Sequence, residues 1–494
     1  MGDNLREQGI KGFLWALLER LSVQAVTFVV TLVLARILSP SDYGTVALLS
    51  IFLAVAGVLV DSGFGNALIQ KKNATELDFN SVFYVSIGIG FVAYVALFFM
   101  APFVAAFYNS DILVPILRVS ATTLLFASIN SVQNAALARK LLFKLSFRVS
   151  LLATIASAIT GIALAVLGYG PWALVWSVFA SNLVGTVARW IVIGWRPKLM
   201  FSFDSLKGLF SYGWKVSVTG LVDTLYNNIY GLLIGKMYSK EDLAFVNKGR
   251  HMPELLMQTI SATLSRVAFP VMSQVQDDDV RIRSMMSKVL KVSCFAVFPV
   301  LGFCAVSAKS ITIILFGEKW LPIVPYMQLA CIMYAFSPFN VVNLQVLLSK
   351  GRSDLYLKLE IIKKIIGVIV VIASVQYSPL CLVAAMSLIV YPVCLVINTW
   401  PISRLVGYGL FAQVRDVFVP LILTAALIVC SYVSANACRV VRCDSTYFSC
   451  LLSLSISALA GFGVYACAAY FMRAEPMIAI LQIIGRHRNN NKEV

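Results

Sequence analysis

The segment ARILSPSDYG, residues 35–44, ends the first of fourteen long apolar segments, and GKMYSKEDLA, residues 235–244, repeats its landmarks. Arg36, Ser39 and Asp42 recur 200 residues later as a Lys, a Ser and an Asp. A second set of landmarks recurs at a spacing of 210 residues: Pro115, Phe126, Asn130 and Lys140 match Pro325, Phe336, Asn340 and Lys350. The repeat predicts a duplicated bundle of helices.

The amino-acid composition is that of a protein surrounded by lipid. Hydrophobic residues make up 60% of the 494 and charged residues 13%, and a soluble domain carries roughly twice that charged fraction. A membrane-spanning helix needs about 20 apolar residues. Fourteen of them leave room for short loops and for no sizeable soluble domain. We therefore predict an all-α polytopic membrane protein with 14 transmembrane helices.

Turn signals separate the predicted spans, because Pro cannot continue the hydrogen bonding of the preceding helix, as at Ser39-Pro40 and Ser378-Pro379. We expect spans at residues 11–37, 41–69, 80–107, 112–138, 145–168, 171–195, 206–238, 242–274, 286–307, 322–349, 354–376, 379–403, 412–435 and 447–472. The landmarks group them into an N-terminal six-helix lobe (1–200), a C-terminal six-helix lobe (201–405), two additional transmembrane helices (406–475) and a cytoplasmic tail (476–494).

Alternate loops differ in their content of Lys and Arg. One set carries most of them, for example Lys71, Arg139 and Arg352, which predicts that this side and both termini are cytoplasmic. Each block has an even number of spans, so the two blocks enter the membrane in the same sense and are expected to enclose a pathway along the axis between them. The formal net charge of +17 then reflects membrane topology, and we expect no nucleic-acid partner.

All ten cysteines follow residue 293, and most lie within apolar spans. The sequence has no CxxC pair and no His-rich partner for one, so we expect no metal site. Without a GxxxxGK loop we also expect no ATP hydrolysis and no cofactor. Cys438 and Cys443 flank a loop predicted to lie outside, where a disulfide and two unpaired thiols are both open interpretations.

The eighth predicted span carries polar groups within the bilayer. Four of them recur at intervals of 4, 3 and 4 residues, which places them on one helix face: Asn247, His251, Glu254 and Gln258. Lys248 and Arg250 flank this stripe, and Arg266 lies further along the helix. A charged side chain at mid-membrane costs at least about 2.5 kcal/mol on insertion scales, so each such group needs a wet cavity or a partner.

Three other spans share this polarity. The first contains Glu19, Arg20 and Gln24, the second contains Asp61, and the seventh contains Lys215, Asp223 and Asn227. The first two spans of one lobe correspond to the seventh and eighth, which begin the other lobe. We therefore expect these four helices to line a water-filled central cavity between the lobes.

The basic residues of these spans favour an anionic substrate, since guanidinium groups match phosphate oxygens with several donors. The expected substrate-binding residues are Arg20, Lys215, Lys248, Arg250 and Arg266. The expected polar lining is Gln24, Asn227, Asn247, His251 and Gln258. Two interpretations of the acidic groups stay open, coupling to a driving ion or acting as counter-ions: Glu19, Asp61, Asp223 and Glu254. A Lys near a helix end can also extend to the interface instead of lining a cavity.

Several of the landmarks resemble a known family. LARILSPSDYG (34–44) resembles the signature after the first span of the polysaccharide-transport branch of the multidrug/oligosaccharidyl-lipid/polysaccharide (MOP) exporters. DSGFG (61–65), GYGPWALV (168–175) and FPVMS (269–273) are similar to the ends of that family's second span, its fifth-to-sixth joint and the end of its eighth span. The resemblance extends over about 11–475, nearly the whole chain, and it indicates the branch rather than the glycan.

The resemblance implies a Wzx-type flippase of the colanic-acid and teichuronic-acid exporter group. Such a protein moves undecaprenyl-pyrophosphate-linked oligosaccharide units from the inner to the outer leaflet of the bacterial cytoplasmic membrane. These units are precursors of O-antigen, capsule or exopolysaccharide. Membrane lipids, and the polymerase and other export machinery, are its implied partners. It also implies that Arg20, Arg250 and Arg266 line the cavity and that the last two spans accompany the lipid tail.

Competing functions remain at this point. A multidrug or cation antiporter of the same superfamily needs an acidic, aromatic cavity, which the Lys and Arg content disfavours. A lipid II flippase shares fourteen spans and a cationic lining, and only the branch motifs disfavour it. A membrane oligosaccharide polymerase or ligase needs catalytic groups on a large outer loop, and the outer loops here are short and without a Ser/His/Asp set or paired carboxylates.

Overall fold

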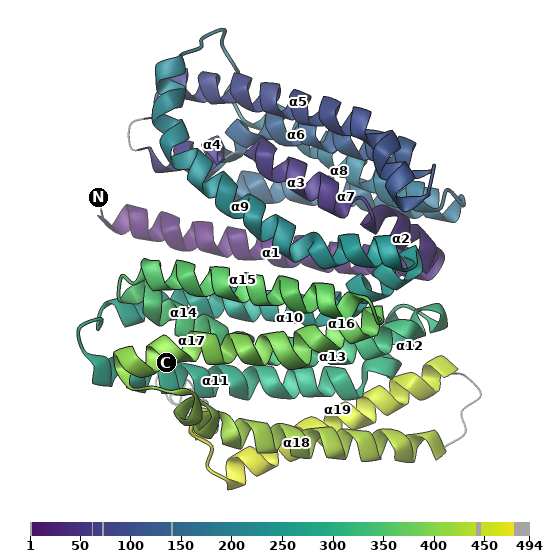
Figure 1. Ribbon diagram of the computed structural model, residues 1–494, viewed down its shortest axis with the longest axis vertical. Helices are drawn as coiled ribbons and strands as arrows, with labels where there is room; N and C mark the ends of the chain where they lie inside the picture. Colours follow the sequence, from purple (N-terminus) through teal and green to yellow (C-terminus); the bar gives the residue numbers. More distant parts are fainter. Residues whose placement is uncertain (1, 62, 72–73, 140–141, 441–445, 479–494) are drawn as a thin grey trace, which may run out of the picture. The chain divides into compact units, whose positions relative to one another are not determined.

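The computed structural model describes residues 2–61, 63–71, 74–139, 142–440 and 446–478, and over these ranges the chain forms helices and no strand (Figure 1). The first half contains α1 (Gly2–Ile37), α2 (Pro40–Ala47), α3 (Ser50–Asp61), α4 (Phe64–Gln70), α5 (Glu76–Tyr108), α6 (Leu113–Arg139), α7 (Phe143–Val166), α8 (Pro171–Val192) and α9 (Phe203–Met237).

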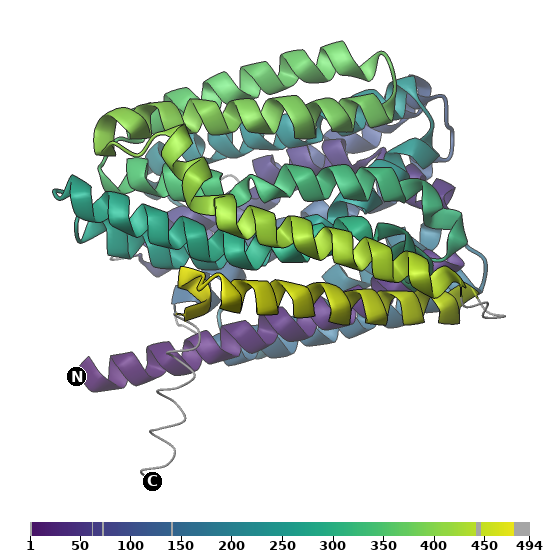
Figure 2. The same cartoon turned by 90° about the horizontal axis from the view of Figure 1, so that it is seen from below.

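The second half continues without a change of architecture. It contains α10 (Lys240–Ser273), α11 (Asp279–Val306), α12 (Ala308–Leu315), the 3₁₀ turn η1 (Glu318–Ile323), α13 (Val324–Ala335), α14 (Ser337–Ser349), α15 (Ser353–Val375), α16 (Pro379–Ala385), the π-helical turn η2 (Met386–Val390), α17 (Tyr391–Val406), α18 (Leu410–Val440) and α19 (Thr446–Phe471). Helix α19 packs against α18, which it crosses in the view of Figure 1, and Figure 2 shows the two helices next to each other.

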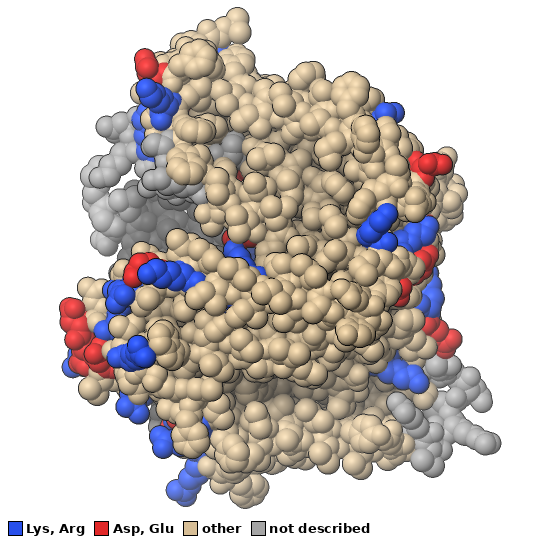
Figure 3. Space-filling model, in the orientation of Figure 1, with Lys and Arg blue, Asp and Glu red and all other residues tan. Residues whose placement is uncertain are grey.

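Eleven helical segments of the described chain are long and apolar enough to cross a membrane, which confirms an all-helical membrane protein. The other three predicted spans, residues 206–238, 242–274 and 354–376, are the long helices α9, α10 and α15. Their charged and polar side chains keep them out of that set. Along the face of each unit seen in Figure 3, most charged side chains gather at helix ends, as expected for helices whose middles contact lipid.

The chain divides into two compact units, residues 1–244 and 245–494. The sequence repeat predicts a different division, into lobes of residues 1–200 and 201–405. That division stays a prediction. Helix α9, which begins the second repeat, packs against α3, α4 and α5 of the first unit. Close approach of α4 and α9 depends on glycine, because a Cβ on Gly63 would lie 2.6 Å from the carbonyl oxygen of Gly213.

The sequence repeat at a spacing of 200 residues is also a structural repeat. Ser39 caps α2, and the Asp42 carboxylate accepts hydrogen bonds from the Ser39 backbone N–H at 2.9 Å and from its hydroxyl at 2.7 Å. Asp242 accepts the same two bonds from Ser239, at 3.2 and 2.7 Å. Such a capping box satisfies backbone donors at a helix start. Both Asp residues are therefore the capping-box partners of the serines that cap the two helices.

Three predicted spans are interrupted helices. The span 41–69 breaks into α2, α3 and α4, with Gly63 in the left-handed region at φ 66°, a conformation that favours glycine. The span 322–349 breaks between α13 and α14, where Pro338 cannot continue the hydrogen bonding. The span 379–403 contains the π-helical turn η2 directly before Tyr391. Apolar length predicts these spans but not their breaks.

Prolines within two long helices release backbone carbonyls that other helices satisfy. Pro102 of α5 has no N–H, so the carbonyl of Phe98 loses its helical partner, and it accepts a hydrogen bond from Arg118 Nε of α6 at 3.4 Å. Pro299 of α11 releases the carbonyl of Phe295 in the same way, and the Tyr465 hydroxyl of α19 donates to it at 2.7 Å.

The helices of the first unit pack closely through small residues. The pairs α5–α6 and α7–α8 contact each other along their lengths. A Cβ on Gly161 of α7 would lie only 2.9 Å from the Ser177 Cβ of α8, and Ala165 is buried against Leu34 and Ala173. The face of α7 formed by Ala153, Ser157, Gly161 and Ala165 is therefore a packing face, since small residues let membrane helices approach.

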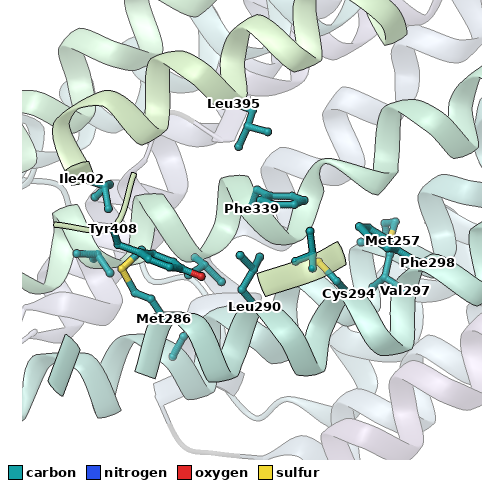
Figure 4. Packing of buried hydrophobic residues seen from close by; sticks show 14 of the residues in the cluster. Met257, Met286, Leu290, Cys294, Val297, Phe298, Phe339, Leu395, Ile402 and Tyr408 are labelled. Atoms are coloured by element: carbon teal, nitrogen blue, oxygen red, sulfur yellow. The ribbon is translucent and has the colours of Figure 1, made fainter. Parts of the chain in front are cut away.

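The second unit has one large apolar core. Met286, Leu290 and Cys294 of α11 pack with Phe339 of α14 and Leu395 of α17, all nearly inaccessible to solvent (Figure 4). A smaller cluster joins α11 to the last two helices, α18 and α19, through residues that include Phe295, Leu423, Leu427 and Tyr465. This cluster and the Tyr465 hydrogen bond make α18 and α19 part of the second unit.

Candidate functional site

The α1 polar stripe faces away from the helices on which α1 packs. Helix α1 contacts chiefly α7 within its unit, and Arg20 and Gln24 are both exposed. Thr27, one turn further along, is exposed as well. An Arg in a membrane helix requires water or an anionic partner, and the described part of the chain supplies no hydrogen-bond partner for the Arg20 side chain.

Glu19 has the opposite environment. One carboxylate oxygen accepts hydrogen bonds from two hydroxyls of α7, from Ser146 at 3.0 Å and from Ser150 at 2.6 Å. Its charge attracts the Arg189 guanidinium of α8. These contacts fit the counter-ion interpretation of Glu19, because the carboxylate is held inside its own unit.

Arg189 is a basic residue of the first unit that sequence reasoning missed. It lies in the sixth predicted span, 171–195, near a helix end, where the sequence alone does not separate an intramembrane Arg from one that extends to the interface. Its side chain is half-buried. Gly185, one turn earlier on the same helix, was the available signal, because a glycine at that spacing leaves room for a folded-back side chain.

The predicted residues of α3 and α9 are dispersed. Asp61 is exposed at the end of α3, and Asn227 is exposed on α9. Asp223 is half-buried and has an interaction partner. The side chain of Lys215 lies outside the described residues, so its predicted contact with substrate stays a prediction.

The α10 stripe is divided between exposed and packed positions. His251 and Gln258 are exposed, whereas Asn247, Arg250 and Glu254 are half-buried. Gln258 Nε2 donates to the Glu254 carboxylate at 3.3 Å, which gives Glu254 a neutral partner one turn away. The Arg266 side chain lies outside the described residues.

The Arg250 guanidinium has a tyrosine neighbour on another helix. The side chain of Arg250 is within hydrogen-bonding reach of the Tyr334 hydroxyl of α13, and the charges of Glu254 and Tyr391 also act on this tyrosine. Tyr391 follows η2, and π-helical turns occur frequently at functional sites. The sequence does not identify either tyrosine, because only the tertiary packing brings α10, α13 and α17 together.

Lys248 is held by aromatic rings. Its ammonium lies 5.7 Å from the ring centroid of Phe316 and 6.0 Å from that of Trp320. Trp320 is fully buried and also packs edge-on against Phe245. Ring faces attract cations by about 0.5–2 kcal/mol. This environment differs from the exposed stripe of His251 and Gln258, and it favours an anchoring role for Lys248 over substrate contact.

Buried amides mark equivalent positions of the two units. In the first, Asn130 Nδ2 of α6 donates to the Thr186 hydroxyl of α8 at 2.7 Å. In the second, Asn340 of α14, which matches Asn130 in the repeat, accepts from Asn398 of α17 at 2.9 Å. One turn away, Asn343 exchanges hydrogen bonds with Gln413 of α18. Asn130, Asn343, Asn398 and Gln413 are buried and Asn340 is half-buried, and their hydrogen bonds between helices indicate a role in helix packing.

The described residues contain no group of three or more His, Cys, Asp or Glu side chains that could hold a metal ion. Cys443 and the side chain of Cys438 lie outside the described residues, so the choice between a disulfide and two thiols is not tested. The charged groups of each unit are therefore the features that can interact with a substrate.

The helical architecture defines an integral membrane protein whose helices carry charged side chains. The sequence profile of the polysaccharide biosynthesis protein family matches residues 33–325, more than half of the chain, and the chain belongs to this family. Its fold is similar to that of the lipid II flippase MurJ in an inward closed conformation, with a TM-score of 0.72 at 12% identity, covering 94% of this chain and 99% of MurJ. A multidrug resistance MATE transporter of the MOP superfamily, inward-facing, gives 0.56 at 14% identity, covering 76% and 94%.

Curated relatives are similar over most of their length. The teichuronic acid biosynthesis protein TuaB of Bacillus subtilis (strain 168) is 26% identical over 432 residues, 86% of this chain and 88% of TuaB. The lipopolysaccharide biosynthesis protein WzxC of Escherichia coli (strain K12) is 23% identical over 381 residues, 76% of this chain and 77% of WzxC. The protein is thus an all-helical membrane protein of the polysaccharide biosynthesis protein family, with a fold similar to that of MurJ and of a MATE transporter.

Proposed function

We propose that this protein is a flippase for lipid-linked oligosaccharide. It moves undecaprenyl-pyrophosphate-linked repeat units from the inner to the outer leaflet of a bacterial cytoplasmic membrane by alternating access. The observation that carries the proposal is the exposure of Arg20 and Gln24 on α1 and of His251 and Gln258 on α10 within membrane helices. Membership of the polysaccharide biosynthesis family supports a glycan cargo.

The chemistry of such a cargo suits these groups. A pyrophosphate carries negative charge that Arg side chains bind with several donors, and sugar hydroxyls hydrogen-bond to amides such as Gln24, Asn227 and Gln258. Arg20 of the first unit and Arg250 of the second are the two arginines proposed to contact the headgroup. Tyr334 adds an aromatic surface beside Arg250.

The polyprenyl chain of the cargo needs an apolar path, whereas the headgroup needs a polar one. An apolar groove of about 340 Å³ lies among α11, α13 and α18 of the second unit, lined by residues that include Phe298, Ile332, Leu421 and Ile428. A second apolar depression follows α18, from Ile422 to Ser434. We propose that lipid chains occupy this surface, where the two additional helices extend the second unit.

The finer topology belongs to the same proposal. Fourteen spans form two parallel six-helix lobes and one further pair, and both termini lie in the cytoplasm. The Lys and Arg content of alternate loops supports this orientation. The polymerase and other export machinery are the proposed partners outside the bilayer.

A lipid II flippase is the second candidate function, because the fold similarity to MurJ extends over 99% of MurJ. That similarity supports a shared fold, whereas the family match supports polysaccharide export. The cargoes of the two candidate functions carry different glycans but the same pyrophosphate group. A multidrug antiporter is less consistent with the exposed Arg20, since cationic substrates are repelled by it.

Depletion of the protein in its native cell tests the function. The proposal predicts that lipid-linked oligosaccharide accumulates on the cytoplasmic leaflet, where periplasm-restricted glycosidases cannot reach it. Accumulation of lipid II instead would support the second candidate. Unpolymerised repeat units on the outer leaflet would contradict both and would indicate a polymerase.

A further inference from the structure

Arg189 has an unusual position for a membrane arginine. A Cβ placed on Gly185 would lie 3.0 Å from Arg189 Nη1 and 3.4 Å from the Ala153 Cβ of α7. The guanidinium therefore folds back over the preceding turn of α8, on the side where α8 packs against α7. Any side chain at position 185 would occupy the same space.

This direction leads away from the nearest helix end. Helical side chains point toward the N-terminus of their helix, and Arg189 lies in the last turn of α8, which ends at Val192. The loop charges predict that this end is cytoplasmic. An arginine that extended to the interface would point the other way. Arg189 instead carries its charge further into the membrane, where an anionic partner is needed.

Among the described residues, one negative charge acts on the Arg189 guanidinium, but none accepts a hydrogen bond from it. Glu19 attracts the guanidinium, but its carboxylate is fixed by Ser146 and Ser150, and no ion pair within 4.0 Å joins Glu19 to Arg189 in the part of the chain that the structure describes. The guanidinium has five N–H donors. Over the same residues it has no hydrogen-bond acceptor, so these donors are free for an anion.

We propose that Arg189 is a headgroup-contact residue: its guanidinium donates to a phosphate oxygen of an isoprenoid pyrophosphate that enters from the α1–α7–α8 end of the first unit. Glu19 is the proposed positioning residue, because its charge attracts the guanidinium without an ion pair that would occupy the donors. The identification of the anion as a pyrophosphate depends on the proposed function. The presence of an anion site is inferred separately, from the placement of Arg189 and Gly185 and from the charge of Glu19.

The test uses the purified full-length protein in detergent and measures its thermal unfolding midpoint against farnesyl pyrophosphate, inorganic pyrophosphate and farnesol. Hydrogen bonds to charged groups contribute enough that Arg189→Gln is expected to weaken binding of farnesyl pyrophosphate roughly tenfold or more. Arg189→Lys keeps the charge and is expected to retain part of the affinity. Farnesol is expected to show no dependence on Arg189.

Gly185→Ala is the sharper variant, since it keeps every charge and displaces only the guanidinium. We expect it to weaken farnesyl pyrophosphate binding severalfold, while the unfolding midpoint of the unliganded protein changes little. If Arg189→Gln does not fold, this variant still tests whether the Arg189 guanidinium binds the anion. Arg148→Gln is the matched control, because Arg148 is exposed on α7 between Ser146 and Ser150. It is expected to bind as the wild type does.

Three outcomes would overturn the inference. Equal binding by wild type, Arg189→Gln and Gly185→Ala would remove Arg189 from the site and leave the proposed flippase function intact. An Arg189-dependent response to inorganic pyrophosphate but not to farnesyl pyrophosphate would identify a free-anion site. No response of the wild type to either anion would exclude the site. Conversely, Arg189-dependent binding in a protein whose depletion leaves the leaflet distribution unchanged would keep the site and reject the flippase.

Discussion

Arg20 and Arg250 have different surroundings within their units. Arg20 is exposed on α1, and the described residues give its side chain no hydrogen bond. Arg250 is half-buried and reaches the Tyr334 hydroxyl. A pre-oriented guanidinium gives geometric specificity, whereas a free one can follow a moving headgroup. The proposed function uses both properties.

Arg20→Ala and Arg250→Ala are each expected to reduce export roughly tenfold, because each removes charge-assisted hydrogen bonds to a phosphate. The amount of oligosaccharide reaching the outer leaflet measures the effect, at equal membrane expression of the variants. Lys358→Ala is the control, since Lys358 is exposed on α15 and belongs to no proposed site. Normal export by the double variant would remove both arginines from the transport path.

The buried amides Asn343 and Gln413 are expected to affect stability, unlike the two arginines, which are expected to affect transport. Asn343 and Gln413 are each almost completely buried and exchange two hydrogen bonds. Asn343→Leu leaves the Gln413 amide without this partner and is expected to cost about 1–3 kcal/mol of unfolding free energy. Asn343→Leu combined with Gln413→Leu is expected to recover part of that loss, as read from thermal unfolding. An additive double variant would show that the pair is not coupled.

Helix α11 shows how a kink is stabilised from another element. Pro299 releases the Phe295 carbonyl, and the Tyr465 hydroxyl of α19 satisfies it at 2.7 Å. Tyr465→Phe is expected to destabilise the protein by about 1 kcal/mol, measured as a fall in the unfolding midpoint. Tyr470→Phe is the control, because Tyr470 is exposed on the same helix.

The same kink allows a coupling test. In a Pro299→Ala background the Phe295 carbonyl can regain its helical N–H partner, so Tyr465→Phe is expected to have a smaller effect there than in the wild type. An equal effect in both backgrounds would mean that the hydroxyl does not act through the freed carbonyl.

The sequence predicts where the helices lie, but it predicts only some of the points at which a helix is interrupted. Apolar length locates α5, α7 and α18 within a few residues, and the repeat of Ser39 and Asp42 at 239 and 242 predicts two equivalent joints, which both form capping boxes. The break at Gly63 depends on its approach to Gly213 of α9. That contact joins residues far apart in the chain, so no local pattern predicts it.

The spacing of polar residues along one helix predicts a candidate site, and that site stays a prediction. On α10 the stripe includes the exposed His251 and Gln258 but also the half-buried Asn247 and Glu254, so spacing alone does not give the exposure. Arg189, Tyr334 and Tyr391 were missed because their relevance arises from packing between helices. The predicted substrate contact of Lys248 stays a prediction, and the rings of Phe316 and Trp320 near its ammonium could not be predicted from its sequence position.

The two units each carry membrane-embedded basic residues, and the account of this protein as a transporter depends on their use. The most direct measurement reconstitutes the purified chain into vesicles that contain a fluorescent polyprenyl-pyrophosphate oligosaccharide. A membrane-impermeant quencher then reports the outer-leaflet fraction over time. We predict that the wild type transfers the lipid between leaflets much faster than vesicles with the Arg20→Ala/Arg250→Ala variant. Transfer no faster than in protein-free vesicles, or equally fast with both proteins, would contradict the account.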